Sequence, residues 1–552
     1  RGVGKEQNLE GSMNDIADKK LEEFPDKEKY KKKVNDMKQL TEIEQKTKKG
    51  EELTREELIF LYEINGKIEG FGYGEDPRIK EIRGKRNIKS VLSIIYNISE
   101  NNIATSLSDF DNNDIVVYYG DFDYTPGLNV KKLKVILGNA NFTSLESAEE
   151  LNNLQTISRS AYFESLKSAE GLDNLQRIDG DAEFDSLESA EGLNNLQRIG
   201  GDAYFKSLKS TKGLNNLQTI GWIAYFESLK SAEGLNNLQR IDGDAYFKSL
   251  ELAEGLDNLQ RIGGYAYFKS LESAKGLDSL QIIGGSADFS NLRSAEGLNN
   301  LQRIGGDAYY KSLKSAEGLN NLQEIGHSAH FELLKSAEGL DNLQRIDRDA
   351  YFESLKSAEG LNNLQRIGRD AHFESLESAE GLNNLQRIGR DAHFESLESA
   401  EGLNNLQRIG GDAHFESLEL AKGLNNLQRI NWTANFKSLK SAEGLDNLQK
   451  IGESAHFESL KSAEGLNNLQ EIGDGAHFES LESAEGLNNL QKIWTANFKS
   501  LKSAEGLNNL QTIWNAHFDS LESAKGLEKC NRYDDIKKDV ERRKEEKNKI
   551  IW

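Results

Sequence analysis

A fixed spacing of apolar residues dominates most of the chain. An aromatic residue recurs every 21 positions from Phe142 to Phe478, with Tyr310 as the only substitution, and two final steps of 20 residues reach Phe498 and Phe518. This makes 19 copies. A fixed period of this size is typical of a solenoid, in which a single repeat buries its apolar face only by stacking on its neighbours.

One repeat shows how each copy is expected to fold. The stretch from Ala371 to Glu374 alternates small or apolar residues with polar ones, which predicts one strand per repeat with one buried face. The apolar residues that follow are spaced by three, which favours short 3₁₀ or α turns over further long strands. These residues are Leu376, Ala379, Leu382, Leu385 and Ile388.

Asn384 has a counterpart in almost every repeat, with Ser279 and Lys529 as the exceptions. A primary amide both donates and accepts hydrogen bonds, so stacked copies are able to bond to the exposed backbone between coils. We interpret this asparagine ladder as structural and not as a ligand site.

The repeat resembles bacterial leucine-rich repeats, and especially the loose variety of receptor L domains, over the residues from Ala140 to Gly526. The resemblance implies a repeat solenoid with a parallel β-sheet on one face and short helical turns on the other. The sequence departs from the standard consensus, because its asparagine lies inside a Gly-Leu-Asn-Asn-Leu turn and Ala-x-Phe replaces Leu-x-Leu. A nearly straight β-solenoid is therefore an alternative geometry.

The ends of the chain lack the repeat. Residues 1–112 are predicted to be a charged, mainly helical N-terminal region, residues 113–139 one or two degenerate capping coils, residues 140–527 the solenoid, and residues 528–552 a C-terminal capping helix. An open stack would expose sheet edges and apolar columns, so both ends of the solenoid are expected to be capped.

Three helices are predicted in the N-terminal region. The Lys- and Glu-rich stretch from Met13 to Lys49 is predicted to be helical or partly disordered. Thr54 followed by Glu57 forms a capping-box pattern for a helix from Arg55 to about Asn65, and Asp76 with Pro77 predicts another helix that runs to about Tyr96.

Composition narrows the classes of function. The formal net charge of -22 argues against a general nucleic-acid binder, because phosphate neutralisation needs clustered Lys and Arg. The single cysteine, Cys530, rules out an intrachain disulfide and replaces a repeat leucine, so we expect it to be buried in the cap. No apolar run is long enough to span a membrane. Because the chain begins at Arg1, we expect a fragment or a processed product, and the compartment, cytoplasm or cell surface, stays open.

The position before the repeated Phe is the leading candidate site. If the strand prediction is right, its side chains point outward, one per coil, and in leucine-rich repeats the outward face of that sheet is the concave binding surface. Tyrosine occupies it along the first part and histidine along the later part: Tyr162, Tyr204, Tyr225, Tyr246, Tyr267, Tyr309, Tyr351, His330, His372, His393, His414, His456, His477 and His517.

Each histidine is followed two residues later by an acid. These acids include Glu374, Glu395 and Glu416. His and carboxylate groups on one face raise the hypotheses of a metal site or of pH-sensitive binding, since imidazole titrates near neutrality and both groups are metal ligands. Repetition of identical blocks would produce the same pairs without selection for a ligand, so no metal or cofactor is predicted.

The Tyr part of the face carries Lys206, Lys248, Lys269 and Lys311 as well as acids, so the face becomes more acidic toward its C-terminal half. A cationic or mixed-charge protein would suit it, and a glycan that stacks on Tyr rings is an alternative partner.

The sequence thus predicts a non-catalytic module for protein recognition or surface attachment. The Ser, His and Glu residues are periodic and lie in equivalent coils, whereas catalysis needs a unique convergent pocket. A structural spacer or surface-layer element with no specific ligand, and a carbohydrate-binding protein, are the alternatives. Neither nucleic acid nor a membrane span is expected, and the oligomeric state stays open.

Overall fold

The computed structural model describes residues 27–72, 74–111 and 114–550, and the side chains of residues 27–29 and 550 are not described. The chain divides into two compact units. The first contains Arg1–Ala140 and Asn153–Arg159, and the second contains Asn141–Asn152 and Ser160–Trp552.

The first unit begins with four helices, α2 (Lys27–Lys49), α3 (Arg55–Leu61), α4 (Pro77–Arg83) and α5 (Ile88–Tyr96). The predicted capping box is present at α3, where the Thr54 side chain accepts from the Glu57 amide and the Glu57 side chain accepts from the Thr54 amide. Residues 13–26 of the first predicted helix lie outside the described residues.

The prediction of one helix from Pro77 to Tyr96 is wrong. The chain leaves the helical path after Arg83, and Gly84 caps α4 through its amide, which donates to the Lys80 carbonyl. A new helix begins after Asn87, whose side-chain oxygen accepts from the Ser90 amide. The cause is local, because an asparagine that bonds to the backbone favours an N-cap over a helix interior.

Short elements complete the first unit and lead into the second. The strands β1, β2, β4 and β6 pair in parallel. The elements are η1 (Glu100–Asn102), β1 (Ile103–Ala104), η2 (Leu107–Phe110), β2 (Val117–Tyr119), β3 (Phe122–Asp123), β4 (Val135–Leu137), β5 (Ala140–Asn141), η3 (Glu149–Leu151) and β6 (Thr156–Ile157).

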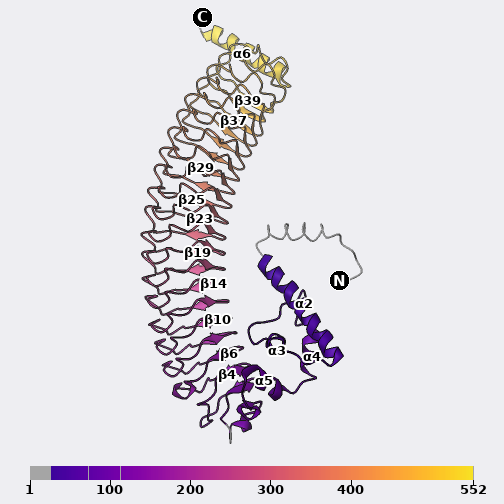
Figure 1. The fold of residues 1–552 in the computed structure, drawn as a ribbon. Helices are drawn as coiled ribbons and strands as arrows, with labels where there is room; N and C mark the ends of the chain where they lie inside the picture. The colour runs from indigo at the N-terminus through magenta and orange to yellow at the C-terminus, as the bar shows by residue number, and fades with distance from the viewer. Residues whose placement is uncertain (1–26, 73, 112–113, 551–552) are drawn as a thin grey trace. The chain divides into compact units, whose positions relative to one another are not determined.

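The second unit is a parallel β-solenoid with two short strands in most coils and one in each of the last two, and its coils follow one another in single file (Figure 1). Sheet A contains β8 (Arg177–Ile178), β10 (Arg198–Ile199), β12 (Thr219–Ile220), β14 (Arg240–Ile241), β16 (Arg261–Ile262), β18 (Ile282–Ile283), β20 (Arg303–Ile304), β22 (Glu324–Ile325), β24 (Arg345–Ile346), β26 (Arg366–Ile367), β28 (Arg387–Ile388), β30 (Arg408–Ile409), β32 (Arg429–Ile430), β34 (Lys450–Ile451) and β36 (Glu471–Ile472).

Sheet B lies one corner further along each coil. It contains β7 (Ala161–Tyr162), β9 (Ala182–Glu183), β11 (Ala203–Tyr204), β13 (Ala224–Tyr225), β15 (Ala245–Tyr246), β17 (Ala266–Tyr267), β19 (Ala287–Asp288), β21 (Ala308–Tyr309), β23 (Ala329–His330), β25 (Ala350–Tyr351), β27 (Ala371–His372), β29 (Ala392–His393), β31 (Ala413–His414), β33 (Ala434–Asn435), β35 (Ala455–His456), β37 (Gly475–His477), β38 (Thr495–Asn497) and β39 (Asn515–His517).

The strands of sheet B are the ones predicted for each repeat. The expectation of one strand per repeat is wrong, because most coils contribute a second strand, to sheet A. Both sheets keep the same register from coil to coil: Arg366 pairs with Arg387 in sheet A, and His372 pairs with His393 in sheet B. The strand in sheet A escaped prediction because it is only two residues long, which is too short for an alternating pattern.

The apolar residues spaced by three close the turns of each coil, as expected. The amide of Leu376 donates to the Phe373 carbonyl, and the amides of Leu382 and Leu385 donate three residues back in the same way. These side chains are completely buried, and full burial of a leucine contributes roughly 1.5–3 kcal/mol. The turns are therefore held by the core columns and not by long helices.

One glycine per coil is required by the stacking. Gly381 has φ of +105°, and a Cβ atom added there would lie 2.0 Å from the carbonyl oxygen of Ala358 in the preceding coil. Neither the backbone conformation nor the close approach tolerates a side chain. This explains the glycine at this position in every repeat after the first, which holds Glu150.

The coils of the second unit stack along a gentle curve. The Phe373 and Phe394 rings in the core lie 5.3 Å apart, whereas the His372 and His393 rings on the outer side of the same strands lie 4.7 Å apart. Since both distances span the same two coils, neighbouring coils lie closer together outside sheet B than inside it. The stack thus bends toward the outer face of sheet B.

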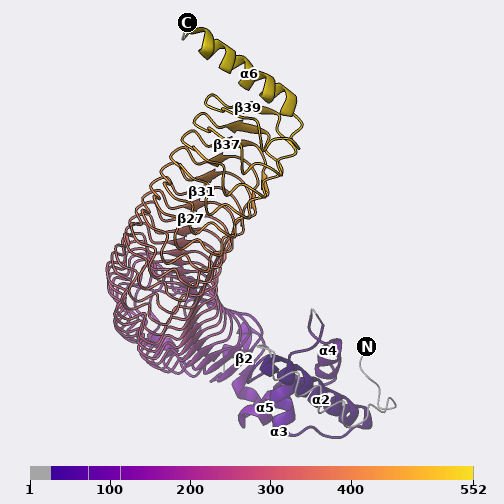
Figure 2. The same cartoon turned by 90° about the horizontal axis from the view of Figure 1, so that it is seen from above.

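The helix α6 (Tyr533–Ile550) follows β39 at the end of the stack (Figures 1 and 2). Its residues Ile536 and Val540 are buried, and so is Cys530 just before it. The helix begins five residues after Glu528, where the sequence placed its start, and residues 551–552 lie outside the described residues. Among the described helices, none combines the length and the apolar character needed to cross a membrane.

Candidate functional site

The fourteen predicted Tyr and His residues occupy the last position of their strands in sheet B, and we refer to them as the Tyr/His ladder. Alternation along the strand determines their direction: in one coil Ala371 and Phe373 are fully buried, whereas His372 between them is only partly buried. His517, in the last coil, is exposed. The ladder therefore lies on the outer face of sheet B.

The rings of the ladder stack on one another, but not without interruption. Parallel rings with centroids 4.6–4.7 Å apart form a run of six coils. This run consists of Tyr309, His330, Tyr351, His372, His393 and His414. A second run joins Tyr204, Tyr225, Tyr246 and Tyr267 at 4.5–4.9 Å. Five coils carry no ring at this position, and hold Asn141, Glu183, Asp288, Asn435 and Asn497 instead.

Five histidines of the ladder contact the acid that follows two residues later. The distance from His Nδ1 to Glu Oε1 is 2.8 Å for His372 and Glu374, 3.0 Å for His393 and Glu395, and 3.2 Å for His414 and Glu416. His330 pairs with Glu332 and His456 with Glu458 in the same way. At two coils asparagine takes the place of the ring: Asn435 donates to Glu416, and Asn497 donates to Glu479.

The second oxygen of each of these carboxylates is buried. The Oε2 atoms of Glu332, Glu374, Glu395, Glu416 and Glu458 have no hydrogen-bond partner. A buried oxygen without a donor is unfavourable, so these atoms keep an unused capacity to accept a hydrogen bond. Three of these carboxylates, Glu374, Glu395 and Glu458, are also close to two imidazoles, as Glu374 is to His372 and His393.

The contact between His393 and Glu395 changes the pKa of both groups. The hydrogen bond to Glu395 raises the pKa of His393, although burial opposes this shift. Burial by itself would raise the pKa of Glu395, but the hydrogen bond with His393 and the charge of the imidazolium lower it overall. The pair therefore favours the charged form of both groups.

Three groups of the ladder combine ligand types that bind transition metals. They are His372–Glu374–His393, His393–Glu395–His414 and His456–Glu458–His477, and the potential ligand atoms of each group lie within 4.8 Å of one another. Ligands of a tetrahedral zinc ion lie closer, at about 3.4 Å from one another, because the bonds are about 2.0–2.1 Å long. Rings that stack in parallel planes would also have to rotate before they could share one ion.

The tyrosine part of the ladder has a different electrostatic environment. The Lys206 ammonium lies 5.1 Å from the centroid of the Tyr204 ring and 2.7 Å from Asp185 Oδ2. Lys248 and Lys311 take the same position over Tyr246 and Tyr309. Burial is the main cause that raises the pKa of Tyr246 to about 12, so its hydroxyl stays protonated at neutral pH. Cation–π contacts thus replace the His–Glu pairs of the later coils.

The outer face of sheet A carries a second row that the sequence analysis missed. It consists of arginines, such as Arg387 and Arg408, beside glutamines. The signal was present, because an Arg precedes the repeated Ile in most coils. The row was not recognised because this segment was expected to form turns.

Comparison with known proteins identifies the repeat. Residues 138–253, 246–356 and 431–540 match the sequence family described as "BspA type Leucine rich repeat region (6 copies)". No curated protein matches the chain.

Similar solved structures include an internalin (inlF) from Listeria monocytogenes, with 14% sequence identity, a TM-score of 0.25, and coverage of 67% of this chain and 89% of that chain. They also include the Toll–Spatzle complex of Drosophila, with 12% identity, a TM-score of 0.24, and coverage of 69% of this chain and 65% of that chain.

Proposed function

The chain belongs to the BspA type leucine-rich repeat family, and from this premise we propose that its solenoid is a non-catalytic module for protein recognition or surface attachment that binds its partner through the Tyr/His ladder. Leucine-rich repeat proteins commonly mediate protein–protein recognition, and solenoids offer extended surfaces for it. The remaining question is which surface of the coils makes the contact.

The observation that carries the proposal is the six-ring run from Tyr309 to His414. Because the rings cover one another's faces, they present their edges to solvent, and these edges carry the tyrosine hydroxyl and the second imidazole nitrogen. Tyrosine and histidine edges combine apolar area with hydrogen-bonding groups and lose little side-chain entropy when they are already packed. A rigid row of this kind suits an extended protein partner.

The charges along the ladder narrow the chemistry of the partner. Among the coils of the His part, Glu374, Glu395 and Glu416 add one carboxylate per coil, each with one buried oxygen that accepts no hydrogen bond. A partner segment with Lys or Arg side chains would complement this charge. The Tyr part already holds its own lysines, so it suits a partner of mixed charge.

Affinity capture tests the proposal with two matched variants. The ladder variant replaces the six residues of the run by asparagine, which the chain itself uses at Asn435 and Asn497, where it donates to a glutamate of the preceding coil. The control variant replaces six exposed glutamates of the same solenoid by glutamine: Glu296, Glu317, Glu338, Glu359, Glu380 and Glu401.

The expected result is that the parent and the control variant capture the same proteins, and that the ladder variant loses them while its circular dichroism spectrum and melting temperature stay those of a folded solenoid. If the ladder variant captures the same proteins as the parent, the ladder is not the binding surface. In that case the stacked rings serve only to stabilise the sheet, as expected of a structural spacer.

A further inference from the structure

The outer face of sheet A holds an unbroken run of cations, which we refer to as the basic ladder. Six successive coils contribute one residue each, and neighbouring residues pair in parallel register. A glutamate occupies the same position in the coil before the run, Glu324, and in the coil after it, Glu471. The run consists of Arg345, Arg366, Arg387, Arg408, Arg429 and Lys450.

The four central arginines of this run lack a carboxylate partner. Arg345 lies 2.5 Å from Glu324 and Lys450 lies 2.6 Å from Glu471, so the ends of the run are neutralised. In contrast, no Asp or Glu oxygen in the described parts of the chain lies within 4.0 Å of the guanidinium nitrogens of the central four. All four side chains are exposed.

The residue two positions after the arginine explains the difference. Where it is aspartate, the arginine pairs with it: Arg177 lies 3.1 Å from Asp179, and Arg240 lies 2.8 Å from Asp242. In the central coils this residue is Gly368, Gly389, Gly410 or Asn431, none of which offers a carboxylate. Like charges directly opposite each other in a sheet repel, so a bound anion would relieve a repulsion that is built into the free protein.

Glutamines form a second row beside the basic ladder. The backbone amide of Gln386 donates to the backbone carbonyl of Gln365 in the preceding coil, and this contact repeats along the stack, so the glutamines stay in register. Grooves of about 480 and 420 Å³ run over two stretches of this face, and only Gln, Arg, Lys and Glu residues line them. The lining of these grooves therefore offers charge and side-chain amides, and it contains no aromatic ring on which a base could stack.

We propose that the basic ladder binds a linear sulfated polysaccharide along the axis of the stack. Guanidinium groups bind sulfate oxygens through two parallel hydrogen bonds, and glutamine amides bond to sugar hydroxyls. Neighbouring strands are about 4.8 Å apart, which is close to the length of one pyranose unit, so successive coils meet successive sugars. Single-stranded nucleic acid is the less suitable polyanion, because its binding depends on aromatic stacking platforms.

The basic ladder and the Tyr/His ladder lie on different sheets, so the proposal stands apart from the proposed protein recognition. Its ligand also differs in kind from a glycan that would stack on tyrosine rings. Since arginine stays charged at every pH near neutrality, binding at the basic ladder is expected to be the same at pH values on either side of the imidazole titration.

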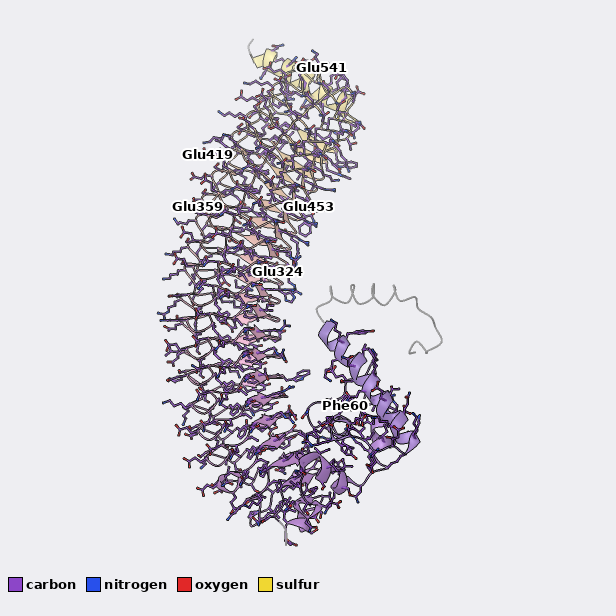
Figure 3. The ribbon with its side chains drawn as sticks, viewed as in Figure 1. Phe60, Glu324, Glu359, Glu419, Glu453 and Glu541 are labelled. Carbon is purple, nitrogen blue, oxygen red and sulfur yellow. The ribbon has the colours of Figure 1, made fainter. Side chains whose placement is uncertain are left out.

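The test measures binding of a fluorescent heparin oligosaccharide of defined length to the full chain by anisotropy, with a single-stranded oligonucleotide of equal charge and with polyglutamate as competing probes. The test variant carries R366Q, R387Q, R408Q and R429Q. The control variant changes the charge equally through K209Q, K230Q, K356Q and K440Q, which are exposed lysines in ion pairs. Glu419, the partner of Lys440, lies toward the margin of the stack opposite Glu324 (Figure 3).

The expected result is heparin binding to the parent and to the control variant, and a dissociation constant at least tenfold higher for the test variant. The slope of log K against log salt should become less steep by roughly three, since each neutralised charge contributes about 0.7–0.9. A second variant with Arg→Lys at the same four positions should bind with intermediate affinity, because it keeps the charge and loses the paired hydrogen bonds.

Three results would overturn the proposal: no heparin binding by the folded parent at low salt, equal binding by the parent and the Arg→Gln variant, or an equal loss in the lysine control. Tighter binding of the oligonucleotide or of polyglutamate than of heparin would also overturn it, because the ladder would then serve another class of polyanion. Since all four arginines are exposed, the variant is expected to stay folded, and a melting curve checks this.

Discussion

The Nδ1 atom of His393 lies 3.0 Å from the Oε1 atom of Glu395, so a ring of the ladder and the acid two residues later are within hydrogen-bond distance. The imidazole ring stacks between those of His372 and His414. The carboxylate of Glu395 lies near His414 of the next coil as well. The hydrogen bond raises the pKa of His393 and lowers that of Glu395, so the stability of this coil is expected to depend on pH.

The first prediction concerns the stability of the solenoid as a function of pH. The folded-state pKa of His393 lies above its ordinary value of 6.5, so its contribution is complete below 6.5 and is lost as the pH rises through the folded-state value. The folded-state pKa of Glu395 lies below its ordinary value of 4.5, so its contribution is present above 4.5 and is lost as the pH falls through the folded-state value. The pair therefore stabilises most between these limits.

The variant E395Q should be destabilised by the order of 0.2–1 kcal/mol at a pH between 4.5 and 6.5, as expected for a partly exposed pair, and by less at about pH 8. Urea unfolding at both pH values measures the difference. E398Q, a change at an exposed glutamate of the same coil, is the control and should show no such pH dependence. An equal effect of E395Q at both pH values would contradict the role of the imidazolium.

The second prediction concerns Tyr310, the one tyrosine in the buried phenylalanine column. Its side chain is completely buried between Phe289 and Phe331, and its hydroxyl has no hydrogen-bond partner. Removal of an unpaired buried hydroxyl should stabilise the protein, so Y310F is expected to raise the free energy of unfolding by about 1–3 kcal/mol. Denaturant titration measures it.

The opposite change at an equivalent coil is the matched control. Phe352 is completely buried and stacks on Phe331 and Phe373. F352Y should lower the free energy of unfolding by an amount similar to the gain from Y310F. A destabilising effect of Y310F would contradict the prediction, because it would mean that an internal water or a shifted neighbour forms a hydrogen bond with the Tyr310 hydroxyl.

The third prediction concerns the core columns. Leu385 is completely buried, so L385A should cost about 2–5 kcal/mol, and L385N more, because an amide would be left without partners. Each coil contacts only its neighbours, so the loss should spread to adjacent coils and spare distant ones. Hydrogen exchange followed along the chain measures this, with E380Q as a surface control. Unchanged exchange in L385N would contradict the fold.

The fourth prediction concerns the asparagine ladder. The Asn384 side-chain amide donates to the backbone carbonyl of Asn362 in the preceding coil at 2.6 Å. N384A should therefore cost about 0.5–1.5 kcal/mol. N383D is the control, since aspartate stands at that position in other coils, as at Asp341 and Asp446, and it should be nearly neutral. Equal effects of the two changes in thermal melts would show that the ladder contributes nothing.

The sequence predicted the fold because its main signal is the period. A Phe every 21 residues, flanked by Ala and a polar residue, was enough to predict stacked coils and the outward direction of His372 and its counterparts. Strict alternation along a strand gives that direction without knowledge of neighbours. The family match and the parallel register of the coils confirm the solenoid.

Features that depend on two or three residues were not predicted. The strand Arg387–Ile388 is too short to show alternation, and the break at Gly84 depends on a single hydrogen bond made by Asn87. The pairing of His393 with Glu395 was anticipated as residues on one face, but whether the atoms meet depends on side-chain conformation. Arg387 lacks a carboxylate partner because the residue two positions later is Gly389 and not aspartate. The sequence did not show this, because it did not place the two residues at the same corner of the coil.

The role of the Tyr/His ladder as a binding surface is tested most directly by the affinity of a captured partner for the parent and for the triple variant H372N, H393N and H414N. Asparagine removes the rings and is able to donate to the glutamate of the preceding coil, as Asn435 does to Glu416 at 2.6 Å. If the ladder is the recognition surface, the dissociation constant rises at least tenfold while the melting temperature is maintained. An unchanged dissociation constant for the folded triple variant would contradict the account.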